Sequence, residues 1–167
     1  MPKNEIAEKY WEKAIKRIKE VNAKLLDGYN VNGNALNGLK EGVVQLVWLA
    51  NIRKKVLPAK SIAVGFYFDI KKKNKTEAEK KAIKKVFEDL HAKKNEIEGL
   101  FPGSQWIWHN PEDKIAANVY CYKKLDYTDE ANLEECLDFH TTMMEQLYEK
   151  VYLPIVMRNQ YLYATCK

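Results

Sequence analysis

Two pairs of strand-like segments, each joined by a short connection, constrain the fold of this chain more than any other feature. The first pair is VVQLVWLA (43–50) and SIAVGFYFDI (61–70), and the second is QWIWH (105–109) and KIAANVYCYK (114–123). β-Branched and aromatic residues of this kind favour strands. A basic turn joins the first pair, and Asn110-Pro111-Glu112-Asp113, a typical turn sequence, joins the second. The sequence therefore predicts two hairpins, and hairpins imply antiparallel pairing.

Three other segments have the three- and four-residue apolar spacing of amphipathic helices. The first covers residues 5 to 26, and the third begins around residue 129. The second opens with Thr76-Glu77-Ala78-Glu79, which is a capping box. Its apolar stripe predicts that Phe87 and Leu90 lie in the core.

The order of these elements is helix, two strands, helix, two strands, helix (α-β-β-α-β-β-α). Pro154 limits the regular continuation of the last helix. We expect an α+β fold in which a single-layer antiparallel sheet of about four strands packs with about three helices. The chain has 167 residues, 46% of them hydrophobic, so we expect residues 1–167 to form a single domain.

Targeting signals and cysteine spacing suggest the compartment. The sequence has no signal-peptide pattern and no apolar run near the length of about 20 residues that a membrane span needs. We therefore expect a cytoplasmic protein with no membrane partner. Cys121, Cys136 and Cys166 match no disulfide or zinc spacing, so we expect reduced thiols.

Charge is distributed unevenly along the chain. Residues 1 to 100 hold 22 Lys and Arg against 13 Asp and Glu, whereas residues 101 to 167 hold 6 against 10. The net charge of +5 thus combines a basic first part with an acidic second part. Such a distribution either presents a basic face to nucleic acid or pairs the two parts of the chain with each other.

A longer motif pattern covers residues 86 to 123. A helix, a lysine, an isoleucine flanked by glutamates, a phenylalanine, a tryptophan-bearing strand and a strand ending near a tyrosine follow one another. The positions are Phe87, Leu90, Lys94, Glu96, Ile97, Glu98, Phe101, Trp106 or Trp108, and Tyr122, and the strand before them ends in Asp69. This pattern resembles the uncharacterised prokaryotic family numbered 4268 among the domains of unknown function. The likeness spans residues 30 to 155.

Members of that family occur alone or behind nuclease-like domains, in gene settings that suggest restriction or phage defence. The resemblance therefore implies a role near nucleic acid, and a shared fold alone assigns no activity.

The glycine- and asparagine-rich segment DGYNVNGNALNGLKEGVVQ (27–45) raises the question of a phosphate-binding loop. Such a loop needs a strand leading in, converging backbone N–H groups, and a helix N-terminus or lysine beyond them. Here a helix leads in, no Gly-Lys-Ser/Thr follows, and Lys40 is the only nearby cation. We interpret the segment as a turn built from residues that tolerate positive φ.

Eight lysines between residues 71 and 85 form the densest basic tract. Lysines neutralise phosphates without reading sequence. We predict nucleic-acid contacts from Lys71, Lys72, Lys73, Lys75, Lys80 and Lys84, with a solvated helix face as the alternative. Trp106 and Trp108 share one face of their strand, because Ile107 separates them. On an open face both would stack bases and join this interface, whereas beneath a helix they would be core.

Asp69-Ile70-Lys71 supports an alternative function, a small metal-dependent nuclease or phosphodiesterase. In such a site an acid holds Mg²⁺ and a lysine stabilises the developing negative charge. Asp27 or Glu41 would have to supply the missing second acid. Under this alternative Asp69 and Lys71 are catalytic and Mg²⁺ is the cofactor. Under the leading interpretation we expect neither a cofactor nor a metal site.

His140 follows Cys136 by one helical turn, a spacing that can place both on one metal ion. No second pair at ligand spacing accompanies them, so we interpret His140 as a histidine whose hydrogen bonds are satisfied at the core boundary.

Together these features predict a non-catalytic binding module for DNA, RNA or a protein partner, in a prokaryotic or phage defence or restriction setting. Formation of a homodimer is left open.

Overall fold

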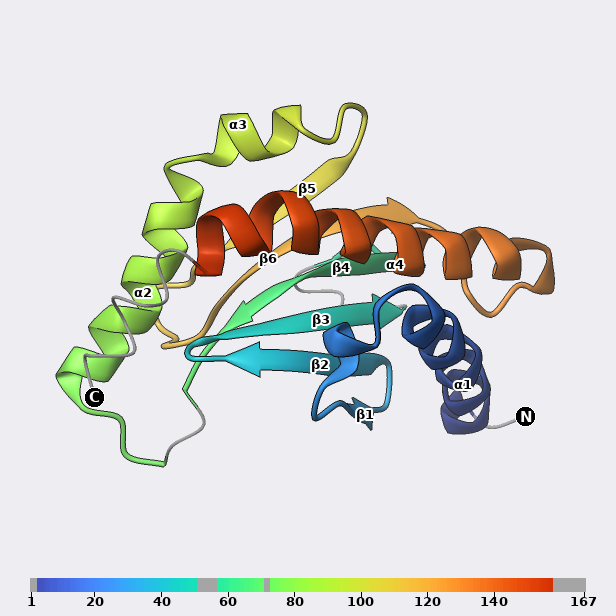
Figure 1. The fold of residues 1–167 in the computed structure, drawn as a ribbon. Coiled ribbons are helices and arrows are strands. Elements are labelled where there is room, and N and C mark those ends of the chain that lie inside the picture. The colour runs from blue at the N-terminus through green and yellow to red at the C-terminus, as the bar shows by residue number, and fades with distance from the viewer. Residues whose placement is uncertain (1–2, 51–56, 71–72, 158–167) are drawn as a thin grey trace.

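The computed structural model describes residues 3–50, 57–70 and 73–157. Its centre is one antiparallel sheet of six strands in the order β1-β2-β3-β4-β6-β5 (Figure 1). The strands are β1 (Asn30–Asn32), β2 (Ala35–Glu41), β3 (Val44–Ala50), β4 (Ser61–Phe68), β5 (Gln105–His109) and β6 (Ala117–Lys124). Both predicted hairpins are present, because β3 pairs with β4 and β5 pairs with β6.

The described chain contains four α-helices, which are α1 (Lys3–Asn22), α2 (Glu77–His91), α3 (Lys94–Gly99) and α4 (Leu133–Leu147). Short 3₁₀ segments follow α1 (Ala23–Leu26) and precede α4 (Glu130–Asn132). Figure 1 shows α4 lying across the sheet, with α1 near one end of α4 and α2 near the other. Among the described helices, none is both long enough and apolar enough to cross a bilayer.

Side chains alternate between the two faces of the central strands. In β4, Ile62, Val64, Phe66 and Phe68 join the large core beneath the helices, whereas Ala63 belongs to a smaller cluster on the other face. This period of two is what a pleated strand imposes. The helices complete the large core, and Phe87 and Leu90 of α2 are buried there as their stripe predicts.

The predicted sheet of about four strands is wrong, because the glycine-rich segment forms β1 and β2. A turn of two residues between Asn32 and Ala35 connects β1 to β2, and another between Glu41 and Val44 connects β2 to β3. Each turn begins with a glycine at positive φ, 60° at Gly33 and 61° at Gly42. A glycine in this first position is typical of the tight turns that match strand twist. The segment therefore does turn the chain, as predicted, but between paired strands.

Gly38 explains how β2 joins the core. The register of β2 against β3 shifts between Asn37 and Lys40, and this bulge lets Leu36 and Leu39, three residues apart, both reach the same core. A β-carbon on Gly38 would lie 2.4 Å from the carbonyl oxygen of Leu25 and 2.6 Å from the Trp48 ring. A glycine is required here because two other elements approach its backbone.

The predicted count of about three helices is also wrong. The second helical pattern breaks after His91, and α3 restarts at Lys94 without a side-chain cap. No glycine or proline marks the break, so it has no local sequence signal. The capping box at Thr76 and Glu79 is present with both hydrogen bonds, so the start of α2 was predictable.

The regular α-helix ends before Pro154, as predicted, but the chain does not leave the helical path there. After Leu147 the chain continues as a π-helix, Tyr148–Val156, with Pro154 inside it. A proline in a helix lacks an N–H donor and crowds the carbonyl of the preceding turn, and a wider turn relieves that crowding.

Replacing Gly65 by Ala tests the packing at the centre of the sheet. A β-carbon there would lie 2.0 Å from the carbonyl oxygen of Val119 in β6, and backbone cannot move aside as a flexible side chain can. We expect Gly65→Ala to lower the free energy of unfolding by about 2 kcal/mol or more, measured by urea denaturation. Gly99→Ala is the matched control, because nothing lies within 4 Å of its added carbon. Equal stability of Gly65→Ala and the unmodified protein would contradict this description of the sheet.

Candidate functional site

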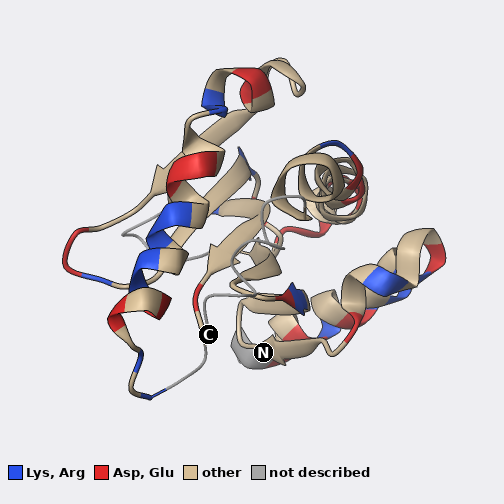
Figure 2. Cartoon of the chain, turned by 60° about the vertical axis from the view of Figure 1, so that its left-hand side comes forward, with Lys and Arg blue, Asp and Glu red and all other residues tan. Residues whose placement is uncertain are grey.

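The basic tract lies on the bend before α2 and on the outer surface of α2. Lys71 and Lys72 lie outside the described residues. Figure 2 shows the remaining lysines interspersed with acidic residues along α2. α2 itself carries four lysines and four acidic residues, so its net charge is zero. The positive charge predicted here is therefore locally compensated within the helix.

Three lysines of the tract form ion pairs within the protein. Lys75 lies 3.6 Å from Asp69, and the Lys75 side chain is only 14% exposed. Lys80 pairs with Glu77 at 3.2 Å, and Lys85 pairs with Asp89 at 2.8 Å. The hydrogen bond to Asp89 raises the pKa of Lys85 above its usual range. Exposed pairs such as Lys85–Asp89 contribute little stability and can exchange for a phosphate.

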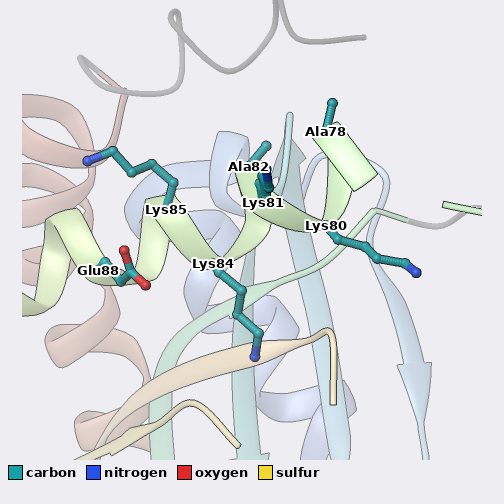
Figure 3. Close-up of a pocket in the computed structure, with 7 residues that line it drawn as sticks. All are labelled: Ala78, Lys80, Lys81, Ala82, Lys84, Lys85 and Glu88. Atoms are coloured by element: carbon teal, nitrogen blue, oxygen red, sulfur yellow. The ribbon is translucent and has the colours of Figure 1, made fainter. Parts of the chain in front are cut away.

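Lys84 connects α2 to another part of the fold through hydrogen bonds. Its Nζ donates to Asn110 Oδ1 at 2.5 Å and to the carbonyl of Pro111 at 3.1 Å, which ties α2 to the connection between β5 and β6. Burial lowers the pKa of Lys84 from its ordinary value. Figure 3 shows this side chain pointing away from Lys80 and Lys85, towards the strand connection. Lys84 was predicted to contact nucleic acid, but its amine is already engaged.

Lys73 and Lys81 are exposed, and neither has a hydrogen-bond or ion-pair partner in the part of the chain that the structure describes. Lys81 also lines a shallow depression of about 600 Å³ on α2 (Figure 3). The lining residues are Ala78, Lys80, Lys81, Ala82, Lys84, Lys85 and Glu88. We name Lys80, Lys81 and Lys85, the lysines of this depression other than Lys84, the outer face of α2.

Trp106 and Trp108 lie on the helix-covered face of β5. Their rings stack with centroids 6.1 Å apart, and Trp108 contacts Phe87 edge-on at 6.2 Å. Both pack against the large core and are partly buried. Their Nε1 atoms are buried and lack a hydrogen-bond partner within the described structure. The open base-stacking platform that we considered for these two residues is therefore not formed.

Asp69 follows β4, and its carboxylate has several contacts. It accepts hydrogen bonds from the Ile70 amide at 2.8 Å and from the Tyr67 hydroxyl at 3.4 Å, in addition to the pair with Lys75. Lys71, its predicted catalytic partner, lies outside the described residues. Asp27 ends a 3₁₀ segment and Glu41 ends β2. Within residues 3–50, 57–70 and 73–157, no group of three His, Cys, Asp or Glu side chains is arranged to hold a metal ion.

His140 is fully buried and forms two hydrogen bonds through its ring. Nε2–H donates to the carbonyl of Leu49 at 2.9 Å, so Nδ1 is the acceptor for the Tyr10 hydroxyl at 2.5 Å. Burial lowers the pKa of His140 to about 4. The interpretation of His140 as a hydrogen-bonded core histidine agrees with this geometry, and burial places it deeper than the predicted core boundary.

The two described cysteines are free and buried. Burial raises the pKa of Cys121 to about 11 and that of Cys136 to about 12, so both thiols are protonated at neutral pH. Cys166 lies outside the described residues.

Comparison with known proteins adds no relative, since no family model, no curated protein and no solved structure matches this chain. The resemblance of residues 86–123 to the uncharacterised prokaryotic family therefore stays a prediction.

The His140 hydrogen bonds predict a specific loss of stability in acid. The pKa of His140 is lowered from 6.5 to about 4. Between these two pH values His140 is therefore protonated in the unfolded chain and neutral in the folded chain, which favours unfolding. This destabilisation is absent above pH 6.5 and grows as the pH falls towards 4. From those two values, it removes about 2 kcal/mol of unfolding free energy between pH 7.5 and pH 5.

We expect the unfolding free energy of His140→Gln to fall between pH 7.5 and pH 5 by about 2 kcal/mol less than that of the unmodified protein. Urea denaturation at both pH values measures the difference. His91→Gln is the control, because it makes the same side-chain change at a histidine that is exposed at the end of α2. An identical pH dependence for His140→Gln and the unmodified protein would contradict the buried, neutral state of His140.

Proposed function

We propose that this protein is a non-catalytic module that binds nucleic acid through the outer face of α2. The observation that carries the proposal is the position of Lys80, Lys81 and Lys85 around one shallow depression on an exposed helix. Lys73, on the bend before the helix, is also exposed. Lysine amines on flexible stems contact phosphates without fixed geometry, so they suit a nucleic-acid backbone.

The arrangement favours backbone contact over base recognition. Lys80 and Lys85 each exchange an exposed carboxylate partner for a phosphate at little cost, and Lys81 has none to exchange among the described residues. Trp106 and Trp108 are turned towards the core, so they offer no stacking platform. We therefore expect weak sequence preference and an affinity that falls steeply with salt.

The resemblance to a prokaryotic family found near nuclease-like domains is compatible with this function and suggests a restriction or phage defence setting. In that setting a separate protein would supply any cleavage. A protein partner for the same surface is the outcome to consider if nucleic acid of every form fails to bind at low salt.

Charge reversal on the outer face of α2 tests the proposal. We expect the double variant Lys81→Glu, Lys85→Glu to bind single- and double-stranded DNA and RNA at least tenfold more weakly at low salt, equally across sequences. The slope of log affinity against log salt should fall by up to about two, one for each phosphate that the variant no longer neutralises. Fluorescence anisotropy with labelled oligonucleotides at several salt concentrations measures both quantities.

The matched control is Lys13→Glu, Lys16→Glu, which makes the same charge change on the exposed side of α1. Equal weakening by both pairs would show that only net charge matters and would overturn the assignment to α2. A thermal unfolding midpoint near that of the unmodified protein is required of both variants, since all four lysines are exposed.

A cleavage assay separates this module from the metal-dependent nuclease. The Asp69 carboxylate is engaged by Lys75, Ile70 and Tyr67, which supports a structural role at the end of β4. We expect no cleavage of labelled DNA or RNA with Mg²⁺ or Mn²⁺. Reproducible cleavage that is abolished by Asp69→Asn would replace the binding proposal with the nuclease.

A further inference from the structure

The two edges of the sheet are protected to very different degrees. β1 forms one edge, and it has only three residues, two of them asparagines. β5 forms the other edge, and in the described part of the chain β6 is its only strand neighbour. A free edge strand presents unpaired backbone N–H and C=O groups that readily pair with another strand.

β5 lacks the features by which proteins normally protect an edge. Its sequence, Gln-Trp-Ile-Trp-His, contains no charged residue and no proline, and its register against β6 is regular over all five residues. Lysines, prolines, bulges and very short edge strands are the usual protections. A five-residue strand of aromatic and β-branched residues at an edge therefore indicates a strand-pairing surface.

The sequence of β5 also indicates what pairs with it. Read in either direction, the strand runs polar, tryptophan, isoleucine, tryptophan, polar. Two such strands that align antiparallel about Ile107 place each Trp106 opposite a Trp108 and each Gln105 opposite a His109. Aromatic pairs directly opposite one another stabilise antiparallel strands, and no like charges meet.

We propose that β5 pairs with β5 of a second copy of this chain, about a twofold axis through Ile107. The two sheets then join into one continuous sheet, in which the twelve strands of two protomers have β1 at both outer edges. A five-residue strand pair buries less area than a standard stable interface, so the dimer is concentration-dependent, with a dissociation constant in the micromolar range.

This pairing has a consequence for the outer face of α2 that rests on the proposed function. A twofold axis perpendicular to the sheet keeps the helix-covered faces of both protomers on the same side. α2 packs close to β5, since Phe87 contacts Trp108 and Lys84 bonds to Asn110 just beyond the strand. The dimer therefore carries two copies of the outer face of α2 on one side, and a long nucleic acid can contact both, which increases its apparent affinity.

Charge substitutions at the ends of β5 test the proposal. In the proposed register, Gln105→Lys with His109→Lys places lysine opposite lysine at both ends of the strand pair. The corresponding Glu pair of substitutions places glutamate opposite glutamate. We expect each double variant alone to dimerise at least tenfold more weakly than the unmodified protein. Mixing the two should restore a dimer, because lysine then faces glutamate. Sedimentation velocity over protein concentrations from roughly 1 µM to 1 mM measures all three samples.

The outcomes are distinct. Dimerisation of the unmodified protein, a weaker dimer in both charged variants and recovery in the mixture support the β5 pairing. A monomer at every concentration overturns it, and so does a dimer that both variants retain, because that dimer uses another surface. Backbone amide exchange provides a readout without substitutions. The amides of β5 that point away from β6 should become more protected as the concentration of unmodified protein rises, and constant protection contradicts the pairing.

The dimer and the nucleic-acid proposal fail separately. Weakened nucleic-acid binding by Lys81→Glu, Lys85→Glu with normal dimerisation supports the outer face of α2 and leaves the β5 pairing to its own test. Dimerisation that the β5 charge variants weaken, without any nucleic-acid binding, supports the β5 pairing and overturns the proposed function.

Discussion

The buried ring of His140 connects three elements on which the rest of the structure depends. It accepts from Tyr10 of α1, donates to the Leu49 carbonyl of β3, and belongs to α4, whose carbonyl at the same residue accepts from Trp48 Nε1 at 3.0 Å. Buried polar groups cost several kcal/mol when unpaired, so each partner must be in place for the others to be stable. This requirement fixes α1 and α4 relative to the sheet, and an aromatic group around Tyr10 and Trp11 packs about it.

α2 is the second point of attachment, and it serves both the core and the surface. Phe87 and Leu90 bury its inner side, and Lys84 ties it to the connection between β5 and β6. Because this inner side is fully used, only the outer face of α2 is available to a partner. The interspersed acidic residues bring the net charge of α2 to zero, so the binding that we propose for this face would be reversible rather than tight.

β5 and α2 pack against each other, so the strand edge and the helix of the two proposals belong to one part of the protein. Trp108 contacts Phe87 and His91 of α2 from one side of β5, while the outer edge of the same strand is the one that the second copy would pair with. Pairing at that edge would bring two binding faces together without altering either one.

Local signals in the sequence were sufficient to predict the elements that have strong apolar patterns, a capping box or typical turn residues. The capping box predicted the start of α2, and β-branched and aromatic residues predicted β3, β4, β5 and β6. The turn sequence Asn110-Pro111-Glu112-Asp113 predicted the hairpin of β5 and β6, whereas residues 51–56 of the basic turn between β3 and β4 lie outside the described residues. The α+β class followed from them. Two-residue turns at Gly33 and Gly42 were readable as hairpin turns, yet the polar, glycine-rich residues around them gave no strand propensity, and β1 and β2 were missed.

Only the tertiary structure decided which side chains are free to act. Tyr10 and His140 are 130 residues apart, Lys84 is 26 residues from Asn110, and no local pattern brings such pairs together. The partial burial of Trp106 and Trp108 likewise depends on side chains from other elements that pack against β5. The sequence shows where charged and aromatic residues occur along the chain. Whether each one is paired, buried or exposed depends on the elements packed against it, and that packing is set by contacts between distant parts of the chain.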